Sequence, residues 1–274
     1  MVRFWAVPTV GVLIGVLVAY GQGRASLRDE KQWGEGKGYL AEGKAREAKT
    51  AFESLLQNYP KEPELHLFFA IASLRLGAVR RAEVHIRKAL DLAPDHLEAR
   101  TLLGWINLEV QKDFPAAIEA YSRVVELKPT SPQAHNNLGV AFRKNGDLNG
   151  AIESFSRALD LRGDYAEAWS NRGWVYVEQE RWREARSDFD QALRLNPRDE
   201  GALYGLSRVL RKSRDYAGAQ EALRALVAHS FNFIYWLEWA ELQLLRYYWI
   251  LLIVAGAFFM HTRYKKMRTK TYGS

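Results

Sequence analysis

The sequence predicts an all-α fold: a superhelical solenoid of six helix-turn-helix repeats with a membrane helix at each end. Three observations lead to this prediction. Small residues recur every 34 or 35 residues through the middle of the chain, alanines recur with the same period, and an uncharged apolar stretch lies near each end. The chain contains no cysteine, which excludes disulfides, thiolate metal sites and cysteine nucleophiles.

The net charge of +7 is carried by the ends of the chain. Residues 1–28 hold three arginines and no acid, and residues 261–274 hold five basic residues and no acid. Residues 29–230 are net neutral, so the region with the repeats has no excess of basic residues to bind phosphates, and we expect no nucleic acid as a partner. Basic charge beside an apolar segment is instead a signal of membrane topology.

The first apolar segment is the uncharged run from Phe4 to Tyr20. As a helix it would extend about 25 Å, enough for a tilted or slightly short membrane span. Arg3 before the run and Ala19-Tyr20-Gly21 at its end also fit a cleaved signal peptide. We favour an uncleaved anchor in residues 1–24, and either interpretation carries the following residues across the membrane.

One face of this first segment is lined by small residues. Gly11, Gly15 and Ala19 recur every fourth residue, and membrane helices associate where small residues let their backbones approach. In the second apolar segment, Gly256 is a candidate complement and Arg246 is a charge that needs a partner or the interface. The partner helix is the chain's own second segment, a second copy or another subunit.

Six repeat units occupy the middle of the chain. Small residues mark each unit at Gly36, Ala70, Gly104, Gly139, Gly173 and Ser207. Alanines follow at Ala48, Ala82, Ala117, Ala151, Ala185 and Ala219. Four residues after each alanine, one helical turn further on the same face, comes a large apolar residue. The 35-residue gaps indicate one extra residue, which we predict in the turn near Lys112-Asp113.

The unit at 166–199 resembles the tetratricopeptide repeat. Its matching residues are Trp169, Gly173, Tyr176, Trp182, Ala185, Phe189, Ala192 and Pro197. The resemblance covers residues 29 to about 230 and implies six units, at 29–62, 63–96, 97–131, 132–165, 166–199 and 200–230. One helix pair cannot bury its apolar face alone, so neighbouring pairs must stack. The resemblance also implies a protein that binds other proteins and catalyses nothing.

The resemblance places a partner-binding groove on the first helix of each unit. The candidate groove residues are Phe68, Ile71, Leu102, Trp105, Asn137, Val140, Arg143, Lys144, Asn171, Trp174, Arg208, Arg211 and Lys212. Asn137 and Asn171 lie one repeat apart and are predicted to pair with the backbone of an extended peptide, because an amide both donates and accepts. The alternative is that they belong to an ordinary solvated helix face. The basic clamp by which family members grip a chaperone's carboxylate is not reproduced, since Gly201 and Gly205 fill its later places.

Two glycine patterns imitate nucleotide-binding motifs. Gly38 to Lys44 matches the start of a phosphate-binding loop, but the next residue is Ala45, where a hydroxyl is required. The second pattern, Gly36 to Ala41, imitates a dinucleotide-binding fingerprint. Neither pattern follows an apolar strand, so we expect no nucleotide and no cofactor. The histidines lack metal-ligand spacing, and His66 and His135 fill the repeat column of Trp169, where we expect packing residues.

The second apolar segment covers residues 242–260, with its most apolar part from Tyr247 to Met260. A connecting helix rich in aromatic residues, 231–241, precedes it, and the basic tail 261–274 follows. This is a stop-transfer pattern, and the positive-inside rule places the tail in the cytoplasm. A buried core helix is the alternative. If the segment spans the membrane with its tail in the cytoplasm, the repeats lie on the non-cytoplasmic side, and we favour the bacterial inner membrane.

These features predict a two-pass membrane scaffold in a lipid bilayer. Its partners would be proteins, the subunits of a membrane complex whose assembly or stability it supports. Two alternatives remain open. One is a permanent accessory subunit held mainly by its membrane helices, and the other is a cytosol-facing receptor on an organelle, which requires the opposite topology.

Overall fold

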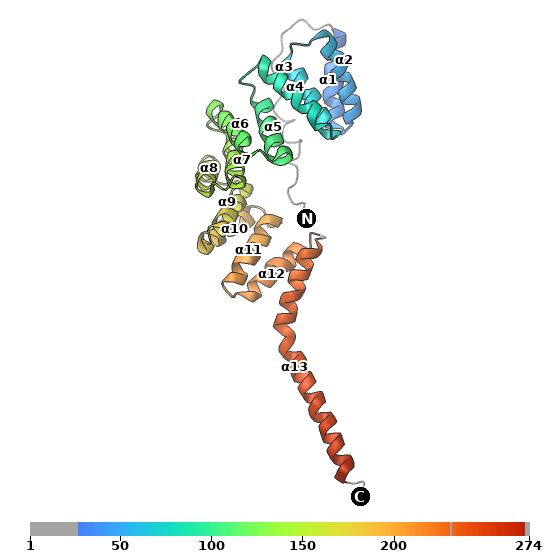
Figure 1. Ribbon diagram of the computed structural model, residues 1–274, viewed down its shortest axis with the longest axis vertical. Helices are drawn as coiled ribbons and strands as arrows, with labels where there is room; N and C mark the ends of the chain where they lie inside the picture. Colours follow the sequence, from blue (N-terminus) through green and yellow to red (C-terminus); the bar gives the residue numbers. More distant parts are fainter. Residues whose placement is uncertain (1–26, 231, 272–274) are drawn as a thin grey trace. The chain divides into compact units, whose positions relative to one another are not determined.

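The structure, a computed structural model, describes residues 27–230 and 232–271, and these residues are helical with no strand among them (Figure 1). The first compact unit contains α1 (Leu27–Ala41), α2 (Ala45–Asn58), α3 (Pro63–Arg75), α4 (Val79–Leu92), α5 (Leu97–Trp105), the π-helix η2 (Ile106–Gln111), α6 (Phe114–Leu127), α7 (Pro132–Lys144) and α8 (Leu148–Leu161). The second contains α9 (Ala166–Glu178), α10 (Trp182–Leu195), α11 (Glu200–Lys212), α12 (Tyr216–Val227) and α13 (Phe233–Thr271). The predicted all-α repeat fold is confirmed. The predicted N-terminal span, with Gly11, Gly15 and Ala19, lies outside the described residues.

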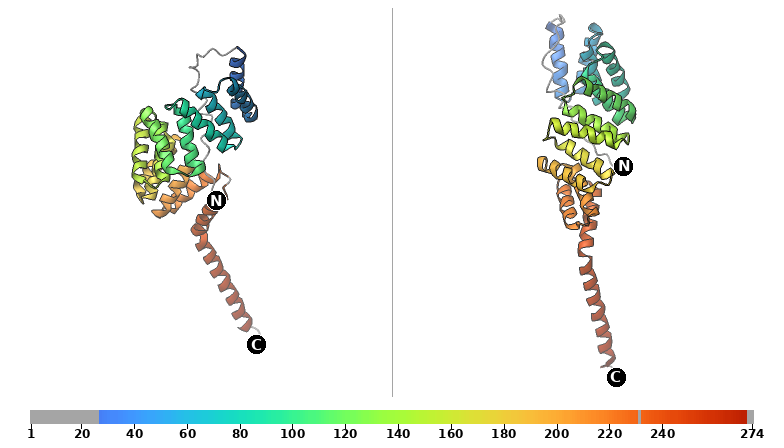
Figure 2. Two further views of the ribbon diagram at one scale, coloured as in Figure 1. Left: turned by 45° about the horizontal axis from the view of Figure 1, so that its top comes forward. Right: turned by 90° about the vertical axis from the view of Figure 1, so that its left-hand side faces the viewer.

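The core of each compact unit is built from clusters that join neighbouring helices. In the first unit, Phe52 on α2 and Phe69 on α3 belong to one cluster, and Ile86 on α4 and Ile106 on η2 belong to the next. In the second unit, one cluster joins α9, α10 and α11, and another joins α11, α12 and α13. Figure 2 shows the successive helix pairs that make these contacts. Each pair therefore depends on its neighbours for burial, as in a repeat protein.

The small-residue column makes room for an aromatic ring on the second helix of the same repeat. A Cβ atom on Gly173 would lie 2.8 Å from the ring of Phe189, and one on Gly139 would lie 2.8 Å from the ring of Phe155. Both rings are fully buried. Glycine here thus permits close contact between α9 and α10 and between α7 and α8.

The turn between the two helices of each repeat contains one residue with a left-handed backbone. These residues are Gly43, Gly77, Lys112, Gly146, Glu180 and Arg214, with φ between 58° and 86°. Gly77 follows Ala70 by seven residues, whereas Lys112 follows Gly104 by eight. The extra residue therefore lies in the helix before the turn, where the backbone widens into η2. The prediction that it lies in the turn near Lys112-Asp113 is wrong, because a π-helix absorbs one residue without changing the turn.

A column of side-chain N–H donors ties the second, third, fourth and fifth repeats to the end of the repeat before. His66 Nε2, His135 Nε2 and Trp169 Nε1 bind the carbonyl oxygens of the residues six positions earlier, at 3.0, 2.9 and 2.8 Å. Arg100 Nη2 makes the same contact with the carbonyl of Pro94. His66 and His135 are buried, as the repeat column predicted. Their role is to satisfy the carbonyls of the loops that close each unit.

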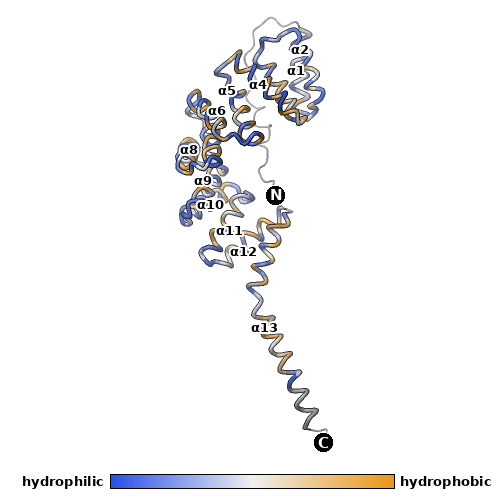
Figure 3. The backbone as a smooth tube through the Cα atoms, in the orientation of Figure 1, coloured by the Kyte–Doolittle hydropathy of each residue, from blue (hydrophilic) through white to orange (hydrophobic). Residues whose placement is uncertain are grey.

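The last helix, α13, is continuous for 39 residues. Residues 231–241 were expected to form a connecting helix and residues 242–260 a membrane span; from Phe233 onward both lie in this one helix. Within the described part of the chain, Phe233–Arg263 is the one helix long and apolar enough to cross a membrane, judged by length and composition alone. Figure 3 shows apolar turns along α13 and a hydrophilic segment further toward the C-terminus.

Candidate functional site

The candidate groove residues of the first unit lie on α3, α5 and α7, the first helices of their pairs. Ile71, Leu102, Trp105 and Val140 are half-buried and pack against the cores. Phe68 is only 8% exposed, and its ring lies 5.5 Å from Phe52 and 5.4 Å from Trp33, centroid to centroid. Phe68 is therefore a core residue, which corrects its predicted place on the surface.

The two asparagines differ in exposure. Asn137 on α7 is half-buried, whereas Asn171 on α9 is 1% exposed and has interactions of its own within the fold. A buried amide needs such partners, because an unsatisfied polar group in the interior is costly. Asn171 cannot contact a peptide from this position, so the predicted pairing of both asparagines with a peptide backbone is corrected to Asn137 alone.

The second unit carries a row of aromatic side chains across α9, α11 and α13. The ring centroid of Trp174 lies 5.9 Å from that of Tyr204, which lies 4.9 Å from that of Tyr235. Trp174 is fixed in place, since its Nε1 donates a hydrogen bond to the carbonyl of Gly201 at 3.1 Å. The guanidinium of Arg208, an exposed residue, lies 5.7 Å from the centroid of Trp174. We call Trp174, Tyr204 and Arg208 the α9–α11 face.

The predicted basic end of the groove is smaller than the sequence suggested. Arg211 forms ion pairs with Glu238 at 3.3 Å and with Glu241 at 3.1 Å, both on α13. The hydroxyl of Tyr204 also donates to Glu238, at 3.0 Å, and burial, followed by this bond, raises the pKa of Tyr204. The charge of Arg211 is therefore used to hold α13, which corrects its predicted role in partner binding.

Other predicted basic residues stay near the surface. Lys144 is exposed at the end of α7, and the neighbouring Arg143 is half-buried with interactions inside the fold. Lys212 is exposed at the end of α11, with its ammonium 5.3 Å from the ring centroid of Trp182. In the first unit the candidate surface is thus largely apolar with Lys144 at one end, and in the second unit it is aromatic and basic.

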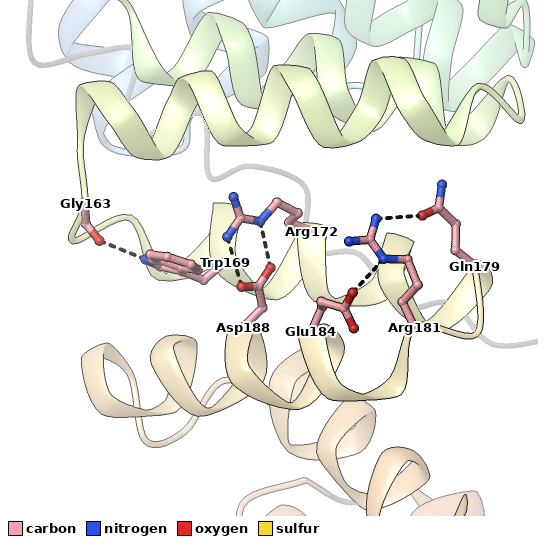
Figure 4. Close-up of polar contacts among 7 residues, drawn as sticks. All are labelled: Gly163, Trp169, Arg172, Gln179, Arg181, Glu184 and Asp188. Carbon is pink, nitrogen blue, oxygen red and sulfur yellow. Dashed lines mark hydrogen bonds and ion pairs between the residues drawn. The ribbon is translucent and has the colours of Figure 1, made fainter.

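The buried ion pair between Arg172 on α9 and Asp188 on α10 was not predicted (Figure 4). Arg172 Nε and Nη2 donate to the two carboxylate oxygens at 2.7 and 3.0 Å, and the Asp188 side chain is 5% exposed. Burial raises the pKa of Asp188, and the guanidinium opposes that rise. The sequence contained a signal, because Arg172 stands in a repeat column that holds Leu138 and Leu206 in the neighbouring units.

Arg246 and Gly256 have different surroundings on α13. Arg246 Nη1 donates to Gln220 on α12 at 3.1 Å, so the predicted need of this charge for a partner is met within the chain. A Cβ atom on Gly256 would meet nothing within 4 Å, so Gly256 remains a candidate for helix packing. Among the described residues, no group of three or more histidine, aspartate or glutamate side chains could hold a metal ion.

Comparison with known proteins gives a consistent family. Three family models described as tetratricopeptide repeat match residues 39–106, 130–198 and 170–233, and a TPR repeat model matches residues 111–146. The chain is 26% identical over 183 residues to anaphase-promoting complex subunit 3 of Schizosaccharomyces pombe. That match covers 67% of this chain and 27% of the yeast protein, so the chain spans about a quarter of the length of this curated relative.

The chain is also similar to solved structures. One is MamA from Desulfovibrio magneticus RS-1, with a TM-score of 0.58, 23% identity, and 66% of this chain and 99% of that chain covered. Another is pilF of Pseudomonas aeruginosa, with a TM-score of 0.66, 20% identity, and coverage of 78% and 96%. At these identities the likeness concerns the fold alone.

Proposed function

We propose that this chain, which belongs to the tetratricopeptide repeat family, is a membrane-anchored scaffold that holds partner proteins at a bilayer surface. Proteins of this family mediate protein–protein interaction. The partners proposed here are subunits of a membrane protein complex, whose assembly or stability the scaffold would support.

The observation that carries this proposal is the double use of α13. Its first turns complete the core of the second unit, with Tyr235 and Leu242 buried against α11 and α12. Its later turns, from Tyr247 to Met260, expose large apolar side chains such as Leu252 and Phe258. Because a single helix does both, a partner bound to the second unit would be held at a fixed height above the bilayer.

The α9–α11 face supports the binding part of the proposal. Tryptophan, tyrosine and arginine dominate the energetics of protein interfaces, because they combine large contact area with directed polar contacts. Trp174 and Tyr204 are fixed by ring contacts and hydrogen bonds, so binding would cost little side-chain entropy. Arg208 adds an exposed positive charge, which favours a partner segment with carboxylates beside an apolar side chain.

The proposed location is an inner membrane with the repeats on the non-cytoplasmic side. Its support is the basic tail 261–274, which follows the apolar part of α13 without any acidic residue. The proposed two-pass topology adds the N-terminal segment of residues 1–24.

Charge reversal on the α9–α11 face tests the binding function. Arg208→Glu should reduce the recovery of crosslinked partners from native membranes, because it places a negative charge beside Trp174. Arg186→Glu is the matched control, since Arg186 is an exposed arginine on the neighbouring helix α10. Equal recovery from the two variants would show that the α9–α11 face does not bind the partner.

A further inference from the structure

The turn between α11 and α12 lies level with the start of the exposed apolar part of α13. α11 runs parallel to α13, because Tyr204 contacts Glu238 and Arg211 contacts Glu241. α12 runs back along α13, with Gln220 bonded to Arg246. Tyr216 begins α12 four residues before Gln220, about 6 Å further along the axis, so it lies level with the turn of α13 that follows Arg246.

This turn presents basic and aromatic side chains. Lys212 and Arg214 are exposed, and Tyr216 is 53% exposed. The acidic residue among them, Asp215, caps α12 by accepting a hydrogen bond from the backbone N–H of Gly218 at 2.9 Å. At the same level, α13 exposes three aromatic residues: Tyr247, Tyr248 and Trp249. Tyrosine and tryptophan concentrate at membrane–water interfaces, and lysine and arginine reach toward phosphates there.

The length of the apolar stretch brings this level close to the bilayer. The fourteen residues from Tyr247 to Met260 extend about 21 Å, whereas the hydrocarbon layer of a bilayer is about 30 Å thick. A span that is too short draws its flanking residues toward the membrane. Before Tyr247, however, one face of α13 already packs against α12, since Leu242 is buried and Arg246 is bonded to Gln220. No free length of α13 therefore separates the second unit from the lipid headgroups.

We infer that the α11–α12 turn, residues 212–216, is a membrane-contact element that binds the phosphate groups of the lipid headgroup layer. Lys212 and Arg214 supply the positive charges, and Tyr216 inserts its ring at the interface. This inference rests on the proposed placement of α13 across a bilayer. It adds a second attachment, which would fix the orientation of the second unit on the membrane surface.

Depth measurement with single cysteines tests the inference, because the natural chain contains none. Tyr216→Cys, Arg198→Cys and Ile253→Cys would each be labelled with a fluorophore in the full chain and reconstituted in phosphatidylcholine vesicles. Quenchers are attached either at the lipid headgroup or at the middle of the acyl chain. Arg198 is an exposed control at the opposite end of α11, which is about 18 Å long between its ends.

Headgroup quenchers should quench the label at position 216 several-fold more than the label at position 198, and acyl-chain quenchers should quench the label at position 253. Equal quenching at 216 and 198, with strong quenching at 253, would overturn the inference and leave the membrane placement of α13 intact. Absence of quenching at 253 would overturn the placement of α13 itself, and the inference with it.

The basic side chains are tested in the same background. Lys212→Gln together with Arg214→Gln should reduce headgroup quenching at position 216 and leave quenching at position 253 unchanged. Quenching at 216 that does not change would show that the two charges do not bind the headgroups. Both residues are exposed, so the fold should tolerate the substitutions, and far-UV circular dichroism checks it.

Discussion

The hydroxyl of Tyr204 on α11 donates a hydrogen bond of 3.0 Å to Glu238 on α13. Arg211, two helical turns further along α11, forms an ion pair with the other carboxylate oxygen of Glu238. One acidic residue thus receives two contacts from α11 and links the repeat stack to the helix proposed to cross the membrane.

Removing Glu238 should loosen this link. Glu238→Ala leaves the partly buried Tyr204 hydroxyl without its acceptor and removes one of the two carboxylates paired with Arg211, and we expect a loss of about 1–3 kcal/mol in the free energy of unfolding. Glu241→Ala is the control, because the exposed Glu241–Arg211 pair contributes about 1 kcal/mol or less. Denaturant unfolding in detergent would measure both, and equal losses would contradict the central role of Glu238.

A side chain at Gly205 should disturb the core of the second unit. A Cβ atom there would lie 2.2 Å from the ring of Phe189, which is fully buried and cannot move away cheaply. We expect Gly205→Ala to lower the free energy of unfolding by about 1–3 kcal/mol. Gly38→Ala on α1 meets no atom within 4 Å and should be neutral or stabilising. If Gly205→Ala leaves the melting temperature unchanged, the close packing of α11 on Phe189 is wrong.

Removing one partner of the buried Arg172–Asp188 pair should cost more stability than replacing both residues with apolar ones. Asp188→Ala removes the carboxylate that pairs with the guanidinium of Arg172, and breaking a buried ion pair from one side costs about 3–5 kcal/mol. The next repeat has Leu206 and Ala222 at the same two positions. The double variant Arg172→Leu, Asp188→Ala should therefore recover most of the stability. Thermal unfolding of the single and double variants measures this, and additive losses would contradict it.

The pair of histidines in the first unit should make stability depend on pH. His66 Nε2 donates to the carbonyl of Pro60, so His66 Nδ1 accepts from His85 Nδ1 at 2.9 Å, and this arrangement needs a neutral His66 ring. Burial, followed by the neighbouring His66, lowers the pKa of His85 to about 4, and burial also lowers the pKa of His66.

The unfolded chain therefore binds protons first, and the stability present above pH 6.5 is lost as the pH falls toward about 4. Hydrogen exchange of α3 and α4 at pH 7 and pH 5 measures this loss. His85→Gln should flatten the pH dependence, whereas the same slope in that variant would show that other groups cause it.

The helices could be predicted from the sequence because burial recurs with the repeat period, so the positions of Gly173 and Phe189 indicate the same packing as those of Gly139 and Phe155. The site could be predicted less well. Arg211 occupies a groove position by repeat spacing, but the carboxylates that neutralise it lie about 30 residues later, on a helix outside the repeat pattern. Nothing in its spacing distinguishes Asn171 from Asn137, although only Asn171 is fully buried. The π-helix η2 was missed because Lys112 takes the turn position that glycine holds in three other repeats, and lysine does not indicate a left-handed backbone.

The central claim, that α13 joins the repeats to the membrane by crossing it, is tested most directly by two reporter fusions. One fusion ends at Ser230, before α13, and the other at Ser274, and each carries a reporter active only in the cytoplasm. The proposed topology predicts a silent reporter after Ser230 and an active one after Ser274. Equal activity of the two fusions would show that α13 does not cross the membrane, and the reverse pattern would place the repeats in the cytoplasm.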